Sequence, residues 1–306
     1  MRVAVIDTGT NSTRLLVAEV SQDGVEEIYR QTRVTRLGEG VDRKGDLSQE
    51  ARDRVIACAD EYASRIDELK VSRSIVIATS SVRDANNGRQ FLQMLAERIG
   101  SDWKLLSGDE EANLSFSGAS SGFRLAGNIN LLDIGGGSTE VVSGVDGKVV
   151  FAKSLRLGCV RLTERFISTD PVSRDELDAA SSFIDGVLAR EIDMGRMARP
   201  ARTIAVAGSV TALAAIDRGL TSYDPAKVHG HVMSLKDIQR MLRELSGMSL
   251  SERLRLPTME TGRADVIVAG SLILERLMRY ADAAELTVSE LDILDGAAGA
   301  LANGEL

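Results

Sequence analysis

The feature that most constrains how this chain can fold is an internal duplication. The segments VIDTGTNSTRLL, residues 5–16, and LLDIGGGSTEVV, residues 131–142, superpose without a gap. The matching pairs are Asp7 with Asp133, Gly9 with Gly135, Ser12 with Ser138 and Thr13 with Thr139. Such a similarity decides the architecture, and the two copies lie too far apart for a short-repeat solenoid. It predicts two domains, each opening on the same strand–turn–strand unit.

The pattern along the rest of the chain favours an α/β fold. A length of 306 residues allows two domains of ordinary size, which we place at 1–125 and 126–306. Strands and hairpins precede βα crossovers in both halves, and such layers gather ligands at the carboxyl ends of strands. Amphipathic spacing predicts a helix over residues 173–198 and a helical pattern from Leu235 onward. We expect a helical C-terminal third whose last helix packs back on the first domain.

Charge and composition exclude several classes of function. The net charge is −8, with 17 basic and 20 acidic side chains in residues 1–125 and 20 and 25 in the remainder. A groove for nucleic acid would show a basic excess, and no apolar run is long enough to span a membrane. The N-terminal residues do not resemble a secretion signal. Cys58 and Cys159 lack metal-ligand spacing, so we expect reduced thiols in a cytoplasmic protein.

The glycine turns have the chemistry of phosphate sites. Glycine lets backbone N–H groups approach an anion, and the hydroxyls that follow add donors. The candidate phosphate-binding residues are Thr10, Asn11 and Ser12 in the first turn, Gly135, Gly136, Gly137, Ser138 and Thr139 in the second, and Gly208 and Ser209 where a strand meets a helix N-terminus. Asp7 and Asp133, at the ends of the preceding strands, offer the hard oxygen ligands that Mg²⁺ prefers.

These residues resemble those of a known family. The paired turns are similar to the superfamily of actin, sugar kinases and heat-shock chaperones, which is built from two ribonuclease-H-like domains with a cleft between them. Within it, the chain resembles the exopolyphosphatase and guanosine pentaphosphate phosphohydrolase family. The two duplicated segments resemble its phosphate motifs, and ATSSVRDANN, SGDEEANLSFSGA and SLRLGCVRLTERF follow its order. Thr10 replaces the more usual Ser, and Gly208-Ser209 a Gly-Gly-Thr. The short two-domain form of the family is implied.

The resemblance implies roles for individual residues. Glu111 corresponds to the general base that positions the attacking water, with Glu110 as the fallback. Asp133 and Glu140 resemble the metal-site carboxylates, with Asp7 contributing through water; the metal is Mg²⁺, with Mn²⁺ as the alternative. Arg83, in a polar turn after the strand at 74–79, would clamp a phosphate that does not react. The orientation of Arg14 stays open, and His229 and His231 are expected to be structural loop residues.

The expected reaction is metal-assisted hydrolysis of a phosphoanhydride. Its first expected substrate is inorganic polyphosphate, which would make the protein an exopolyphosphatase, and guanosine pentaphosphate (pppGpp) is the alternative. A small-molecule kinase of the same superfamily and a nucleotide switch without catalysis are the more distant alternatives. The resemblance also implies a homodimer, and no nucleic-acid or membrane partner is expected.

Overall fold

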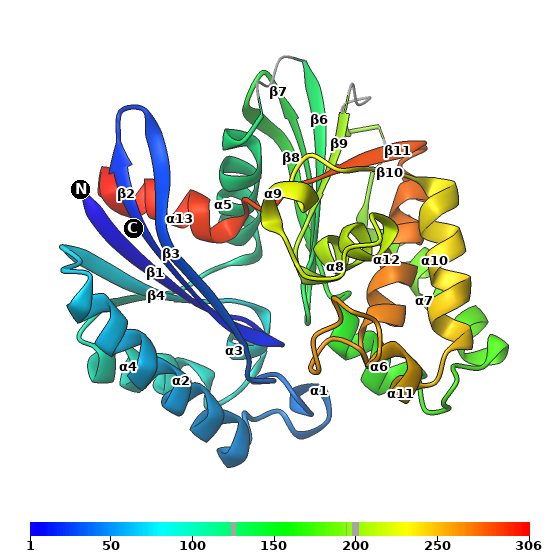
Figure 1. Ribbon diagram of the computed structural model, residues 1–306, viewed down its shortest axis with the longest axis horizontal. Helices are drawn as coiled ribbons and strands as arrows, with labels where there is room; N and C mark the ends of the chain where they lie inside the picture. The colour runs from blue at the N-terminus through cyan, green and yellow to red at the C-terminus, as the bar shows by residue number, and fades with distance from the viewer. Residues whose placement is uncertain (124–126, 194, 198–201) are drawn as a thin grey trace. The chain divides into compact units, whose positions relative to one another are not determined.

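A computed structural model describes the chain except for residues 124–126, 194 and 198–201 (Figure 1). The chain divides into two compact units. Unit 1 comprises Met1–Ser121 and Leu291–Leu306, and unit 2 comprises Gly122–Glu290. The domain boundary expected between residues 125 and 126 lies outside the described residues.

Unit 1 is built on a five-stranded sheet with the strand order β3-β2-β1-β4-β5. Its strands are β1 (Arg2–Thr8), β2 (Ser12–Ser21), β3 (Gly24–Val34), β4 (Arg73–Ala78) and β5 (Asp102–Leu105). The first three strands are antiparallel neighbours, whereas β4 pairs in parallel with both β1 and β5. The turn between β1 and β2 therefore lies at the carboxyl end of the parallel strand β1, where a ligand site is expected.

Helices cover both faces of this sheet because β1 and β2 are apolar at successive positions. Ala4 and Ile6 belong to one core cluster, and Val3 and Val5 to another, as the two-residue period of a strand requires. The first cluster includes side chains of α2 and α4, and the second includes side chains of α13. The helices of unit 1 are α1 (Val41–Lys44), α2 (Gln49–Glu68), α3 (Ser80–Asp84), α4 (Gly88–Ile99), α5 (Gly108–Ser121) and α13 (Ile293–Asn303).

Unit 2 repeats this topology with one additional strand. Its sheet has the order β10-β11-β9-β6-β7-β8. The strands are β6 (Asn128–Ile134), β7 (Thr139–Val145), β8 (Lys148–Leu155), β9 (Arg202–Val206), β10 (Val232–Ser234) and β11 (Glu285–Val288). As in unit 1, an antiparallel triplet is followed by parallel pairs, here β6 with β9 and β9 with β11. The duplicated segments thus form equivalent hairpins, β1–β2 and β6–β7.

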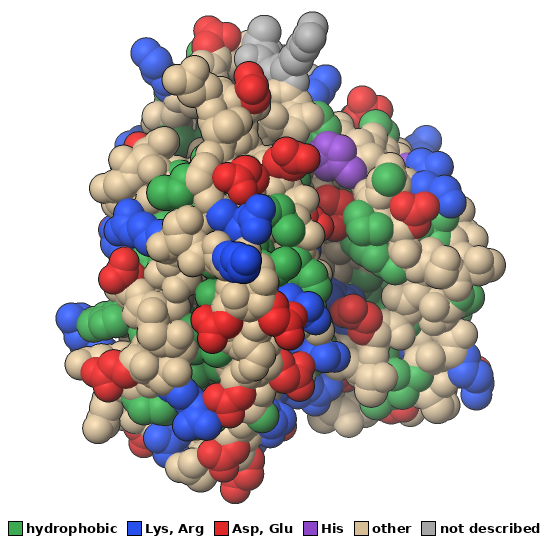
Figure 2. Space-filling view, turned by 60° about the vertical axis from the view of Figure 1, so that its left-hand side comes forward, with side chains coloured by type: hydrophobic (Ala, Val, Ile, Leu, Met, Phe, Trp, Pro, Cys, Tyr) green, Lys and Arg blue, Asp and Glu red, His purple; other side chains and the backbone are tan. Residues whose placement is uncertain are grey.

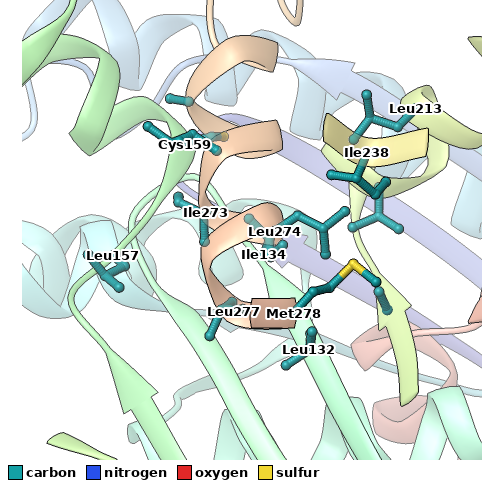
Figure 3. Close-up of a cluster of buried hydrophobic side chains, with 14 of the residues drawn as sticks. Leu132, Ile134, Leu157, Cys159, Leu213, Ile238, Ile273, Leu274, Leu277 and Met278 are labelled. Carbon is teal, nitrogen blue, oxygen red and sulfur yellow. The ribbon is translucent and has the colours of Figure 1, made fainter. Parts of the chain in front are cut away.

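The core of unit 2 lies between this sheet and α12, which is buried over most of its length. Figure 3 shows Leu132 and Ile134 of β6 near Ile273, Leu274 and Met278 of α12. The helices of unit 2 are α6 (Cys159–Phe166), α7 (Arg174–Glu191), α8 (Gly208–Asp217), α9 (Pro225–Val228), α10 (Leu235–Gly247), α11 (Leu250–Arg253) and α12 (Ile267–Tyr280). The β6 strand that carries Asp133 is therefore supported by a rigid apolar layer.

The expected α/β class with two similarly built halves is confirmed, but two details of the pattern were wrong. The helical pattern from Leu235 onward is interrupted by β11, a short apolar strand between β9 and β10. The helix expected over residues 173–198 ends at Glu191, because Ile192 adopts an extended conformation. Residues 194 and 198 of that range lie outside the described part.

The surface carries charges of both signs, as the similar numbers of acidic and basic residues in the sequence lead one to expect. On the face shown in Figure 2, acidic and basic side chains are interspersed. Among the described residues, no helix is long and apolar enough to cross a membrane.

Candidate functional site

The turns of the two equivalent hairpins close in the same way. Gly9 N donates to the Ser12 carbonyl at 3.0 Å, and Gly135 N donates to the Ser138 carbonyl at 3.0 Å. A Cβ atom on either glycine would lie 3.1 Å from that same carbonyl oxygen. The duplication seen in the sequence is therefore a duplication of backbone geometry.

In unit 1, the chain that follows β3 packs against the back of the first turn. Gly38 N donates to the Thr10 carbonyl at 2.9 Å, and two N–H groups of residues 35–36 donate to the Asn11 carbonyl at 3.1 and 2.8 Å. In a trans peptide the N–H points opposite to the C=O of the same plane. The N–H groups of Asn11 and Ser12 consequently face away from this segment, in the arrangement that binds anions.

In unit 2, the start of α6 has the same relation to the second turn. Its first two N–H groups donate to the carbonyls of Gly135 and Gly136 at 3.0 and 2.9 Å. Arg161 Nε donates to the Gly137 carbonyl at 2.9 Å. The N–H groups of Gly136, Gly137 and Ser138 therefore face away from α6. Three successive N–H groups pointing one way form a concave donor set for a phosphate.

The hydroxyls of Thr13 and Thr139, the equivalent threonines of the two hairpins, are each bonded to the segment behind the turn. Thr139 is fully buried and its hydroxyl donates to the Leu157 carbonyl at 2.7 Å. The equivalent Thr13 hydroxyl lies 2.9 Å from the Thr35 hydroxyl. Both side chains bond the segment behind the turn, and the phosphate contact predicted for Thr139 stays a prediction. Thr10 bonds Ser80 Oγ at 3.1 Å.

The carboxylates of the second hairpin are brought together as the sequence predicted. Asp133 and Glu140 are direct cross-strand partners in β6 and β7, so their side chains lie on one face of the sheet. Both are buried, and Ser154 Oγ donates to Glu140 at 2.7 Å. Two adjacent carboxylates fit Mg²⁺, which keeps several waters and takes few protein ligands. The described residues contain no group of three or more His, Cys, Asp or Glu side chains able to hold a metal.

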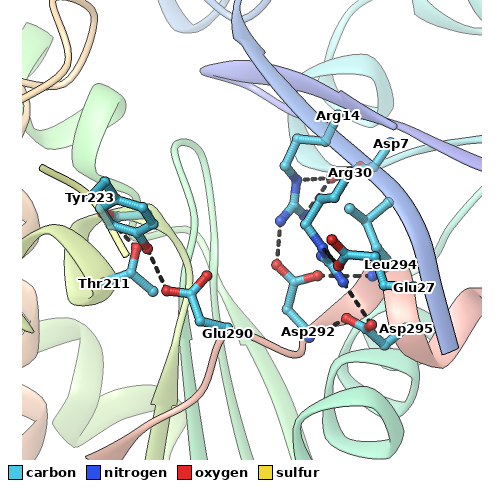
Figure 4. Close-up of polar contacts among 11 residues, drawn as sticks. Asp7, Arg14, Glu27, Arg30, Thr211, Tyr223, Glu290, Asp292, Leu294 and Asp295 are labelled. Carbon is cyan, nitrogen blue, oxygen red and sulfur yellow. Dashed lines mark hydrogen bonds and ion pairs between the residues drawn. The ribbon is translucent and has the colours of Figure 1, made fainter. Parts of the chain in front are cut away.

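Asp7, the counterpart of Asp133, lies in a different electrostatic setting. Its Oδ2 accepts hydrogen bonds from Arg14 Nη2 and Nε at 2.6 and 3.0 Å (Figure 4). Its Oδ1 is buried and has no hydrogen-bond partner. Burial raises the pKa of Asp7, and the charge of Arg14 opposes this only in part. Oδ1 is therefore an acceptor that a water molecule would satisfy, and the water-mediated metal role predicted for Asp7 stays a prediction.

Arg14, whose direction the sequence left open, points into a buried charge network of unit 1. It also binds Asp292, the N-cap residue of α13, and Arg30 binds Asp295 at 2.7 Å (Figure 4). Burial would raise the pKa of Asp292, but the charges of Arg14 and Arg30 outweigh it and lower that pKa. The first hairpin is thus fastened to the N-terminus of α13.

Glu111 and Arg83 are brought together in unit 1. Glu111, in the first turn of α5, is buried, and Arg83 Nη1 lies 3.2 Å from its Oε2. The same Nη1 donates to the Leu106 carbonyl at 2.7 Å. The polar turn expected to contain Arg83 is the short helix α3, which directly follows β4. Glu110 instead bonds the Ser107 N–H at 2.9 Å, a capping contact, and this bond lowers its pKa.

The third turn is more crowded than the sequence indicated. A Cβ on Gly208 would lie 1.5 Å from Arg263 Nη1, so this arginine lies against the turn. Ser209 is buried, and a Cβ on Gly270 would lie 2.3 Å from its hydroxyl oxygen. Ala207 has φ 74° and ψ 169°, a conformation that glycine favours. Nothing in the sequence links Arg263 to this turn. Its contact with Gly208 can be seen only in the folded structure.

Both histidines are bonded within unit 2. His229 stacks on Phe123 with ring centroids 4.9 Å apart, and its Nδ1 accepts the Glu290 N–H at 3.2 Å. Burial lowers the pKa of His229. His231 Nε2 lies 2.8 Å from Asp217. These contacts support the structural role predicted for both.

The fold and these turns define a class: α/β proteins with two ribonuclease-H-like units, each carrying a glycine hairpin suited to phosphate. The sequence matches the Ppx/GppA phosphatase family over residues 16–297, and the chain belongs to that family. It is 38% identical to Exopolyphosphatase 2 of Mycobacterium tuberculosis, over 98% of each chain. The crystal structure of the Aquifex aeolicus Ppx/GppA family member has a TM-score of 0.82 at 30% identity, covering 100% of this chain and 98% of that one. An exopolyphosphatase from Cytophaga hutchinsonii has a TM-score of 0.89 at 26% identity, covering 99% and 98%.

Proposed function

We propose that this protein is an exopolyphosphatase, which hydrolyses the terminal phosphoanhydride bond of inorganic polyphosphate and releases orthophosphate. The observation that carries the proposal is the pair of turns whose carbonyls are bonded from behind and whose N–H groups face the other way. Membership of the Ppx/GppA phosphatase family and relatives named exopolyphosphatase support the same reaction.

In this proposal Glu111 is the general base. Its carboxylate accepts a proton from the water that attacks the terminal phosphorus, the P–O bond to the shortened chain breaks, and orthophosphate is released. Arg83 Nη1 orients Glu111 at 3.2 Å, and the rest of its guanidinium binds a phosphate that does not react. The turn N–H groups stabilise the charge on the equatorial oxygens of the transferred group. A polyphosphate leaving group is a weak base, so no general acid is required.

Asp133 and Glu140 would hold the divalent cation, with Mg²⁺ as first choice and Mn²⁺ as second. The cation would neutralise charge on the phosphate oxygens. The equivalent cross-strand position in unit 1 is Arg14, a fixed cation already paired with Asp7. We therefore propose the second hairpin as the metal site, and the contact through water expected for Asp7 stays a prediction.

Three finer points belong to the same proposal. The chemistry would equally remove the 5′-terminal phosphate of pppGpp, which makes this nucleotide the second substrate to test. Cys58 and Cys159 are buried free thiols, which supports a cytoplasmic protein. A homodimer is proposed from family resemblance alone, and light scattering of the purified protein would test it.

The deciding experiment measures orthophosphate release from short polyphosphate, long polyphosphate and pppGpp, with Mg²⁺, for the wild type and Glu111→Gln. We expect release from polyphosphate that the substitution abolishes. Release from pppGpp alone would reassign the substrate. Transfer of phosphate from ATP to a small molecule without orthophosphate release would favour a kinase. Full activity in Glu111→Gln would remove Glu111 from the mechanism.

A further inference from the structure

Each glycine turn is supported by a second repeated segment, which lies outside the duplicated hairpins. The tripeptide Arg-Leu-Gly occurs at residues 36–38, after β3, and again at residues 156–158, after β8. The leucines of both copies, Leu37 and Leu157, are fully buried. We call these two tripeptides the backing segments. They occupy equivalent places in the two units, so the duplication extends beyond the hairpins.

The glycine of the second backing segment touches the backbone of the turn. A Cβ on Gly158 would lie 2.2 Å from the Gly136 oxygen and 2.4 Å from Gly137 N. These are backbone atoms, which cannot move aside as a flexible side chain would. Gly158 has φ −150°, an ordinary extended conformation, so its backbone alone would accept any residue. The absence of a side chain at Gly158 therefore serves the close approach and not the conformation.

The glycine of the first backing segment is also closely approached, here by side chains of the first turn and of α3. A Cβ on Gly38 would lie 2.4 Å from Thr10 Cγ2 and 3.0 Å from the Ser81 Cβ. Gly38 N donates to the Thr10 carbonyl, as the N–H groups after Gly158 donate to the second turn. In both units a glycine thus allows a backbone segment to reach the turn carbonyls.

We propose that Gly38 and Gly158 are positioning residues for phosphate binding. By allowing the backing segments to hold the turn carbonyls, they fix the peptide planes with the N–H groups directed at the ligand before it arrives. The ligand class is a phosphate chain, so this inference rests on the proposed function. Preorganised donors act without rearrangement, and losing one such donor costs on the order of a hundredfold in rate or more.

The test compares Gly158→Ala with Gly186→Ala, because a Cβ on Gly186 of α7 would meet no atom within 4 Å. The first readout is the rise in thermal midpoint that tripolyphosphate produces without turnover, and the second is kcat and KM on polyphosphate. Gly158→Ala is expected to lose the tripolyphosphate shift and to lower kcat/KM on the order of a hundredfold. Gly186→Ala is expected to match the wild type. An unchanged shift and KM in a folded Gly158→Ala protein would overturn the proposal.

A second pair of variants applies if Gly158→Ala does not fold. Thr139→Val removes the hydroxyl bond to Leu157 of the backing segment, whereas Thr139→Ser keeps it. We expect Thr139→Val to raise KM several-fold and Thr139→Ser to restore it; equal KM values in a folded pair would contradict the positioning role. A wild-type enzyme that released no orthophosphate would refute the proposed function. Tripolyphosphate binding, measured without turnover, would still decide the positioning role.

Discussion

Replacing Ala207 with glycine should make the protein more stable. Ala207 precedes α8 with φ 74° and ψ 169°, where an L side chain is strained. Holding a non-glycine residue in that region costs about 1–3 kcal/mol. Its carbonyl accepts the N–H groups of Val210 and Thr211 at 3.0 and 3.1 Å, which explains how the surrounding structure enforces this conformation.

The magnitude follows from two opposing terms. Ala207→Gly removes the strain of about 1–3 kcal/mol, whereas the more flexible unfolded chain costs about 0.4–1 kcal/mol. The net stabilisation is about 1 kcal/mol, which corresponds to a rise in Tm of about 2–4 °C in a unit of this size.

Differential scanning calorimetry and urea unfolding would measure this change. The matched control is Ala179→Gly, the same substitution at an exposed position inside α7. There it should lower the free energy of unfolding by about 1 kcal/mol, since glycine is a poor helix former. Opposite signs for the two substitutions are the signature of strain at Ala207. A loss of stability in Ala207→Gly equal to that in the control would refute the reasoning.

Three further predictions concern the site and its surroundings. Glu111→Gln should lower kcat by about a hundredfold or more, measured as phosphate release. Glu110→Gln alters a helix cap, so it should keep kcat and lose about 1 kcal/mol of stability in urea unfolding. Equal losses of kcat in the two variants would contradict the assignment of Glu111 as the base. Asp133→Asn should weaken Mg²⁺ binding by about tenfold or more in titration calorimetry, whereas Asp146→Asn, at the far turn of β7–β8, should not; equal weakening would argue against the metal site. Burial opposes the shift at Glu176, but hydrogen bonds from surrounding hydroxyl and N–H groups outweigh it and lower its pKa below 4.5. Stability from this group is therefore present above pH 4.5 and lost as the pH falls below it, so Glu176→Gln should show a smaller acid-induced drop in urea midpoint than the wild type.

The parts of the fold that the sequence predicted well are those governed by local pattern. The dipeptide Asp146-Gly147 is a local signal for the two-residue turn of the β7–β8 hairpin, and both residues adopt the positive φ that such a turn requires. The strand β11 was missed because four residues beside long helices carry too little periodicity to identify a strand. Its place in the sheet depends on pairing with β9 and β10, which no local pattern encodes.

The same distinction between local sequence pattern and tertiary packing applies to the residues of the candidate site. Asp133 and Glu140 were selected by the family resemblance, and their seven-residue separation within one hairpin agrees with the observed cross-strand pairing. The contact of Arg14 with Asp292 spans 278 residues, and that of Gly208 with Arg263 depends on the approach of a distant loop. Only the packed structure brings such distant pairs together, so the sequence could not predict these two contacts.

The proposed single metal site would follow from a difference between the two hairpins. Both hairpins keep the aspartate at the end of the first strand and the same turn closure. At the position across from this aspartate, unit 1 has Arg14, which forms ion pairs with both Asp7 and Asp292. Unit 2 has Glu140 at the equivalent position. A guanidinium beside a carboxylate satisfies it, while a second carboxylate beside the first increases the local attraction for a divalent cation. If the proposed metal site is right, this one change of charge at equivalent positions would make the second turn depend on a metal and leave the first with a fixed cation, Arg14.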